Sequence, residues 1–237
     1  MKKKAVLFDL DGVIIDSETN RDEITKEILK EFKIVYEPRD VKEYISGKNS
    51  KECAQYIVNY YNLNVSFELF ESKRKNLILR VYRDIIPFKN GFNKLFELLK
   101  AELDSAMGIV TGCDREFYTA IDDRLHITDL FGNNVYFTQD IGYQKPSPEI
   151  IFYACSKIGV RPQDTVVFED SPNGVTSALS AGCKIVALTN TFSKQRILES
   201  YHKFTGKFIE KDKILFIDDF VGNLEQILSY LNTNSHY

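Results

Sequence analysis

Two aspartates, Asp9 and Asp11, follow the apolar run 5–8 and are separated by one residue. Because side chains alternate along a strand with a period of two, both carboxylates leave the strand end on the same side. Buried carboxylates this close repel each other unless a cation or hydrogen bonds compensate their charge. Gly12 then permits a sharp turn that keeps them at the sheet edge. The pattern indicates a metal-assisted reaction, and the alternative is an Asx-type turn that ends a strand.

Further polar residues follow later apolar runs, where strands are expected to end. They are Thr111 and Gly112 after 107–110, Lys145 before a helix expected from Ser147, and Glu169 and Asp170 after 166–168. In open parallel sheets, ligands bind beyond the carboxyl ends of the strands. A set of carboxylates with one lysine, one hydroxyl and a glycine turn suits Mg²⁺ binding and phosphoryl transfer, because magnesium prefers hard oxygen ligands. Taken singly, each pair has a structural alternative, such as an acidic helix N-terminus.

In this order, the motifs resemble the haloacid dehalogenase (HAD) superfamily, in particular its capped phosphatase and β-phosphoglucomutase-like branch. The resemblance rests on Asp9-Leu10-Asp11-Gly12-Val13, Thr111-Gly112, Lys145-Pro146 and Glu169-Asp170, and on a helical insertion after the first motif. It spans nearly the whole chain. It implies an α/β fold with a Rossmann-like doubly wound parallel sheet and an inserted α-helical cap domain.

The resemblance also implies catalytic roles. Asp9 would attack phosphorus as the nucleophile and form an aspartyl-phosphate, and Asp11 would act as the general acid and base. Thr111, helped by the amide of Gly112, would bind the transferring phosphoryl oxygens. Lys145 would neutralise charge on Asp9 and on the phosphate. These residues would make the protein a phosphoric monoester hydrolase.

The cofactor implied by the same resemblance is Mg²⁺. Asp9, the main-chain carbonyl of Asp11, and Asp170 would hold the ion, with Glu169 bound to it or beside it. The cluster contains no His or Cys, which fits a hard cation.

Apolar runs and helical patterns alternate regularly after Pro87, which predicts parallel strands joined by right-handed crossovers. The expected strands are 106–110, 135–138, 165–168 and 184–188, and the expected helices are 91–102, 172–181 and two that start at Asp114 and Ser147. Serine followed by proline at Ser147 and at Ser171 is typical of a capped helix start.

From about residue 17 to residue 83 the pattern is helical, with three apolar stripes. They are Ile24, Ile28 and Phe32; Ala54, Ile57, Val58 and Tyr61; and Phe67, Phe70, Leu77, Ile78 and Val81. A helical block placed after the first strand predicts an inserted cap with its own small core. We expect the cap to span 16–85 and the catalytic core to span 1–15 and 86–237.

Two cations of the expected cap, Arg21 and Lys48, are candidates for substrate binding, and the alternative is that both are exposed on helix surfaces. Mutases of the resembling branch carry a His near the place of Arg21, and a lysine where this chain has Ser46. Hydrolysis is therefore favoured over isomerisation. A β-phosphoglucomutase-type isomerase and a catalytically silent protein that binds a phosphorylated metabolite stay open as alternatives.

The chain has 237 residues, 43% of them hydrophobic, and a formal net charge of −3 with both signs interspersed. This balance argues against nucleic acid or an anionic membrane as a partner and favours a small phosphorylated metabolite. The four cysteines are far apart, which indicates reduced thiols in a cytoplasmic protein. We expect a monomer.

Overall fold

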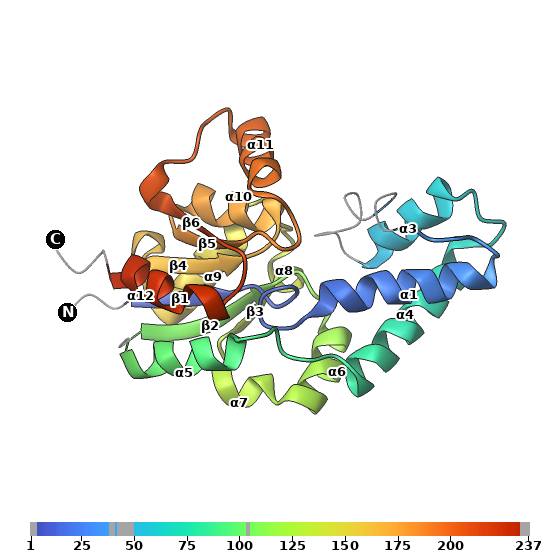
Figure 1. The fold of residues 1–237 in the computed structure, drawn as a ribbon, viewed down its shortest axis with the longest axis horizontal. Helices are drawn as coiled ribbons and strands as arrows, with labels where there is room; N and C mark the ends of the chain where they lie inside the picture. Colours follow the sequence, from blue (N-terminus) through green and yellow to red (C-terminus); the bar gives the residue numbers. More distant parts are fainter. Residues whose placement is uncertain (1–3, 38–40, 42–49, 103–104, 233–237) are drawn as a thin grey trace.

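The computed structural model describes residues 4–37, 41, 50–102 and 105–232. A six-stranded sheet in the order β3-β2-β1-β4-β5-β6 forms its core (Figure 1). The strands are β1 (Lys4–Phe8), β2 (Ser105–Thr111), β3 (Val135–Phe137), β4 (Thr165–Glu169), β5 (Lys184–Leu188) and β6 (Ile214–Ile217). Every neighbouring pair is parallel, which confirms the predicted doubly wound α/β fold.

Helices cover both faces of the sheet, and Figure 1 shows α10 and α11 on one side with α5 and α7 on the other. They are α5 (Phe92–Glu102), α6 (Arg115–Leu125), α7 (Ile127–Phe131), α8 (Thr138–Ile141), α9 (Glu149–Ile158), α10 (Pro172–Ala181), α11 (Lys194–Thr205) and α12 (Leu224–Asn232), with 3₁₀ turns η1 (Pro162–Asp164), η2 (Lys211–Lys213) and η3 (Val221–Asn223). Alternation along β1 divides the core: Val6 and Phe8 join one apolar cluster, and Ala5 and Leu7 join the other.

The two predicted serine caps have different outcomes. Ser171 caps α10, because its Oγ accepts a hydrogen bond from the Gly174 amide at 3.0 Å. The prediction that Ser147 caps the next helix upstream is wrong, since α9 begins at Glu149. Pro148 takes the N-cap position, one residue after Ser147, and the Ser147 hydroxyl donates to the Glu149 carboxylate.

Helices α1 (Ser17–Glu31), α3 (Ser50–Tyr60) and α4 (Phe67–Asp84) pack on one another beyond the carboxyl end of β1 (Figure 1). They share an apolar core of their own, which includes Ile28, Ile57 and Phe70. The C-terminal end of α4 joins the core of the sheet instead, through Val81 and Tyr82. The predicted helical cap is therefore present, while its limits at 16 and 85 stay a prediction.

The two connections between the sheet and these helices run side by side. Ile15 forms an antiparallel bridge with Phe88, and the Asp16 amide donates to the Pro87 carbonyl at 3.1 Å. The helices are thus attached through two short segments that are paired with each other.

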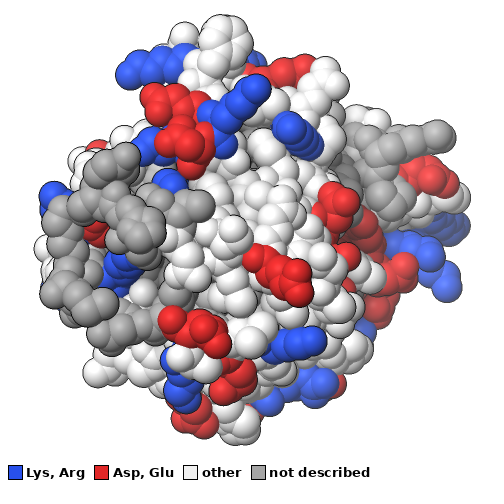
Figure 2. Space-filling view, turned by 60° about the vertical axis from the view of Figure 1, so that its left-hand side comes forward, with Lys and Arg blue, Asp and Glu red and all other residues white. Residues whose placement is uncertain are grey.

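Three further observations concern the cysteines, the helices and the surface charge. The four cysteines are free and buried, and no described helix is both long and apolar enough to cross a bilayer. Figure 2 shows one face of the molecule, on which Lys and Arg alternate with Asp and Glu without gathering into a continuous basic area. A cytoplasmic location stays a prediction.

Candidate active site

The strand order reverses beside β1, because the chain passes from β1 to β2 and β3 and then returns to β4 on the other side. Ligands bind at such a switch point, beyond the carboxyl ends of the strands. Asp9 follows β1, Glu169 ends β4 and Asp170 follows β4. The Asp9 amide donates to the Phe168 carbonyl at 2.9 Å. The two acidic motifs, 160 residues apart in sequence (169 minus 9), therefore lie side by side.

Lys145 lies between these motifs. Its Nζ is 2.6 Å from Asp9 Oδ1, 2.5 Å from Glu169 Oε1 and 3.1 Å from the Val110 carbonyl oxygen at the end of β2. Burial lowers the pKa of this ammonium, but the carboxylates of Asp9 and Glu169 outweigh burial and hold it above its ordinary value. Lys145 is therefore a permanent cation that joins the ends of three strands.

The carboxylates nearest Lys145 carry more negative charge than one ammonium can balance. Burial raises the pKa of Asp9 to about 7, with Lys145 opposing and Glu169 and Asp11 adding to the rise. Burial, followed by Glu18 and Glu169, also raises the pKa of Asp170 well above its ordinary value. Such shifts mark a site where a further cation is favourable.

Oxygen atoms of Asp9, Glu169 and Asp170 lie within 4.8 Å of one another, and all three residues are buried. This donor set consists of hard oxygen atoms only, and its excess of negative charge fits a divalent cation such as Mg²⁺. The residues present thus fit the predicted metal.

Glu169 is held by more contacts than the other two carboxylates. Its Oε2 accepts hydrogen bonds from the Asp170 amide at 3.0 Å, the Ser171 amide at 2.9 Å and the Ser171 hydroxyl at 3.0 Å, while Oε1 contacts Lys145. A Cβ at Gly174 would lie 1.6 Å from Glu169 Oε1, so the first turn of α10 needs glycine there. A search for sequence motifs does not find Gly174. The sequence feature that could indicate its role is a glycine inside a helix, where glycine is unfavourable.

Two residues from other segments lie against the carboxylate of Asp170. The Thr191 hydroxyl, in the loop after β5, donates to Asp170 Oδ2 at 2.7 Å. Gly12 has φ of +75°, and a Cβ there would lie 2.0 Å from Asp170 Oδ2. The turn after Asp11 therefore needs glycine for its conformation and for this close approach.

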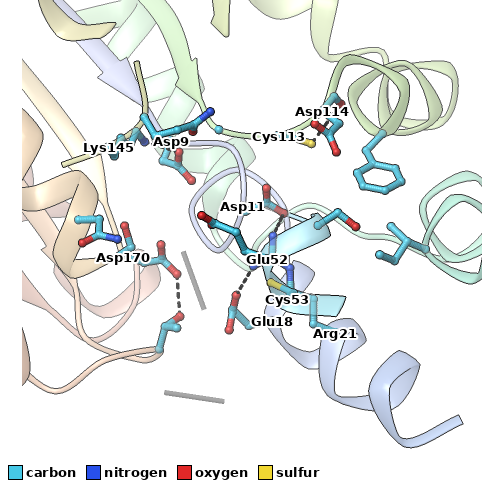
Figure 3. A pocket seen from close by; sticks show the side chains of 18 of the residues that line it. Asp9, Asp11, Glu18, Arg21, Glu52, Cys53, Cys113, Asp114, Lys145 and Asp170 are labelled. Carbon is cyan, nitrogen blue, oxygen red and sulfur yellow. Dashed lines mark hydrogen bonds and ion pairs between the residues drawn. The ribbon is translucent and has the colours of Figure 1, made fainter. Parts of the chain in front are cut away.

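Asp11 faces the helical cap. Its Oδ1 lies 3.0 Å from Arg21 NH2 on α1 and accepts a hydrogen bond from the Tyr82 hydroxyl on α4 at 3.3 Å. Arg21 NH1 in turn lies 3.0 Å from Glu18 Oε1 (Figure 3). Arg21 therefore contacts the candidate acid directly. Sequence reasoning misses Tyr82, because an aromatic residue on an apolar helix face reads as core.

Thr111 is the last residue of β2, and Gly112 follows it. Thr111 is 1% exposed, and its Oγ1 accepts a hydrogen bond from the Cys113 amide at 2.9 Å, so its own proton is available for donation. A Cβ at Gly112 would meet nothing closer than Gln144 Oε1 at 3.8 Å, so space alone does not require glycine there.

A cavity of about 290 Å³ lies between the carboxyl ends of the strands and the cap helices (Figure 3). The predicted site residues that line it are Asp9, Asp11, Arg21, Gly112, Lys145 and Asp170. Thr111 and Glu169 are adjacent to lining residues but do not line the cavity themselves. Lys48 lies outside the described residues.

Comparison with known proteins identifies the class. Residues 6–188 match the family described as haloacid dehalogenase-like hydrolase. A probable pseudouridine-5′-phosphatase of Drosophila melanogaster is 32% identical over 188 residues, which cover 76% of this chain and 79% of the relative. A phosphorylated carbohydrates phosphatase of Thermotoga maritima is 27% identical over 181 residues, covering 76% of this chain and 82% of the relative.

Among solved structures, a family IA, variant 3 HAD hydrolase of Entamoeba histolytica superposes with a TM-score of 0.74. The two sequences are 24% identical, and the superposition covers 96% of this chain and 99% of the chain from Entamoeba histolytica. The chain belongs to the haloacid dehalogenase-like hydrolase family. It is an enzyme of that family, and the predicted family and fold are confirmed.

Proposed function

We propose that this hydrolase is a Mg²⁺-dependent phosphatase that cleaves a small phosphomonoester, a sugar phosphate or related metabolite, through an aspartyl-phosphate intermediate. The observation that carries the proposal is the contact of Lys145 Nζ with Asp9 at 2.6 Å and with Glu169 at 2.5 Å, beside Asp170, at one end of a cavity. A fixed nucleophile, a fixed cation and a partly compensated acidic cluster are what phosphoryl transfer needs.

In the first step, a carboxylate oxygen of Asp9 attacks phosphorus, an O–P bond forms, and the bond to the ester oxygen breaks. Lys145 holds the other carboxylate oxygen, Oδ1, and so orients the attack. Asp9, Asp170 and the main-chain carbonyl of Asp11 would hold Mg²⁺, which supplies positive charge to the phosphoryl oxygens when bound. Glu169 would lie beside the ion without coordinating it, because both of its carboxylate oxygens already accept hydrogen bonds.

Asp11 donates a proton to the departing alkoxide and later accepts one from the water that hydrolyses the aspartyl-phosphate. Both roles need its carboxyl group to turn toward the reacting phosphate, and its present partners Arg21 and Tyr82 lie on the cap helices. The Thr111 hydroxyl and the Gly112 amide would donate to the phosphoryl oxygens.

The substrate class is supported by two features. The cavity of about 290 Å³ suits a metabolite rather than a polymer. The relatives described above are named phosphatases of pseudouridine 5′-phosphate and of phosphorylated carbohydrates.

The test is phosphate release from a panel of phosphorylated sugars, polyols, nucleotides and glycolate, with Mg²⁺ or with EDTA, for the wild type and Asp9→Asn. Release that requires both Mg²⁺ and Asp9 supports the proposal. Conversion of β-glucose 1-phosphate to the 6-phosphate without net release would identify a mutase instead. Asp11→Asn tests the proposed acid, because this change should remove turnover while affinity for the substrate is kept.

A further inference from the structure

Arg74 is a buried arginine of α4 that lines the same cavity as Asp9 and Lys145. It is 4% exposed. Its NH1 donates to the Ser50 carbonyl at 3.3 Å and to the Ser50 hydroxyl at 2.9 Å, and its Nε has no hydrogen-bond partner. A guanidinium carries five N–H donors, and the one on Nε is left unpaired at a buried position.

The arginine ion pairs described around this cavity involve Arg21 and not Arg74. Arg21, the second guanidinium of this cavity, is paired with Asp11 and Glu18. Among the described residues no carboxylate forms an ion pair with Arg74. Burial lowers the pKa of Arg74 and repulsion from Arg21 adds to this effect, while interactions with Cys53, Tyr82 and Glu71 oppose it only in part. Buried charges are normally paired, so an unpaired buried arginine at a cavity wall indicates an anion that the cavity is built to receive.

We propose that Arg74 binds a second anionic group of the substrate, a carboxylate or a second phosphate, on the cap side of the cavity. This inference rests on the proposed phosphatase function, and it narrows the substrate class to phosphomonoesters with a further negative charge. The reacting phosphate belongs at Asp9 and Lys145, whereas Arg74 belongs to the cap helix α4. A substrate that reaches both ends would also hold the cap against the sheet.

A purely structural role is the competing explanation, because the Ser50 contacts tie α4 to the first residue of α3. The two explanations differ in what replacement of Arg74 changes. Loss of a structural tie weakens the binding of all ligands alike, whereas loss of an anion contact weakens only the ligand that carries the second charge.

The experiment measures binding by calorimetry with Mg²⁺ in the Asp9→Asn background, so that none of the ligands is turned over. Two of the ligands are 6-phosphogluconate and sorbitol 6-phosphate, open-chain six-carbon phosphates. The first carries a carboxylate where the second carries a hydroxymethyl group. The third ligand, hexitol 1,6-bisphosphate, carries a second phosphate. Of the two ligands with a second anionic group, we expect the one that binds more tightly to exceed sorbitol 6-phosphate in affinity by at least about tenfold. The Arg74→Met variant should lose that preference.

The matched control is Arg80→Met, the same substitution on the same helix, because Arg80 is largely exposed and pairs with Glu27 outside the cavity. It should leave the preference unchanged. Should the Met variant fail to fold by circular dichroism, Arg74→Lys keeps the charge but loses the planar fork, and it should reduce the preference only in part. Equal affinities for all three ligands, or a preference that survives both Arg74 variants, would overturn the inference.

A separate assay distinguishes this inference from the function on which it rests. Phosphate release from p-nitrophenyl phosphate by the wild type, together with no charge preference, would leave the phosphatase standing and remove the role of Arg74. No release from any phosphate ester, together with an Arg74-dependent preference, would remove the phosphatase and leave an anion-binding site.

Discussion

Lys145 Nζ lies 2.6 Å from Asp9 Oδ1 and 2.5 Å from Glu169 Oε1, so one ammonium joins the residue after β1 to the last residue of β4. Asp9 and Glu169 come from strands that neighbour each other in the sheet but stand far apart in sequence. The nucleophile of the proposed reaction is thus oriented by a side chain from a third segment, and its position depends on the whole sheet being formed.

Replacement of Lys145 by Met should impair both activity and stability. The change leaves the buried carboxylates of Asp9 and Glu169 without their cation, which costs about 3 kcal/mol in free energy of unfolding at neutral pH. The rate of phosphate release should fall by about a thousandfold, because the transferring phosphoryl group also loses a cation. Urea denaturation at pH 7 and pH 5 checks the stability claim. The loss should be smaller at pH 5, where Asp9 is protonated, and an equal loss at both values would contradict the account.

Gly174→Ala should destabilise the protein although alanine favours helices. Its Cβ would meet Glu169 Oε1 at 1.6 Å, so the carboxylate must move away from Lys145 and Ser171. We expect a loss of about 2–3 kcal/mol in free energy of unfolding. The matched control is Ser180→Ala at an exposed position of the same helix, which should change stability by less than about 0.5 kcal/mol. A Gly174→Ala variant as stable as the control would show that Glu169 is not fixed as described.

The pKa of Asp9 predicts a pH dependence of metal binding. Folding raises this pKa from 3.8 to about 7. Between these two pH values the carboxyl group of Asp9 is therefore protonated in the metal-free folded protein and ionised in the unfolded chain. The contribution of Asp9 to stability therefore declines as pH rises between these two values. Mg²⁺ binds the deprotonated form, so its affinity should increase by up to about tenfold per pH unit below 7.

The measurement is the rise in melting temperature on addition of MgCl₂ at pH 6 and at pH 8. The rise should be larger at pH 8, and Asp9→Asn should reduce both the rise and its dependence on pH. An equal rise at both pH values in the wild type would contradict the assignment of Asp9 to the metal site.

Thr191→Val tests the positioning of Asp170 from outside the sequence motifs. The change removes the 2.7 Å hydrogen bond to Asp170 Oδ2 and keeps the shape of the side chain. We expect the Mg²⁺ concentration for half-maximal activity to rise by about tenfold, the range typical of residues that orient a metal ligand. Titration of activity with MgCl₂ measures it. Thr189→Val is the control, because the Thr189 hydroxyl contacts Asp218 and the Ile217 carbonyl instead. An equal change in both variants would argue against a specific role of Thr191 in positioning Asp170.

The residues visible from sequence are those at strand ends. Apolar runs of strand length mark where Asp9, Thr111 and Glu169 stand, and the topology of a parallel sheet then brings them together. The stripes at helical spacing likewise predict the cap helices. These signals are local, so the fold class and the core of the candidate site follow from them.

The remaining features depend on contacts between distant segments, which no local pattern encodes. Thr191 reads as an ordinary loop residue until β5 places it against Asp170. Arg74 reads as a solvated cation in the pattern of α4, whereas the structure buries it at the cavity wall. Ser147 has the sequence of a helix cap, but α9 begins one residue later than that pattern predicts, with Pro148 at the N-cap.

The central claim is that Asp9 is the nucleophile of a Mg²⁺-dependent phosphatase. The most direct test is mass spectrometry of the acid-quenched protein during turnover of the best substrate from the panel, alongside phosphate release by the wild type and by Asp9→Asn. The account predicts a phosphoryl adduct on the peptide that contains Asp9, Mg²⁺-dependent release by the wild type, and neither in the variant. Release that persists in Asp9→Asn, or an adduct on another residue, would contradict it.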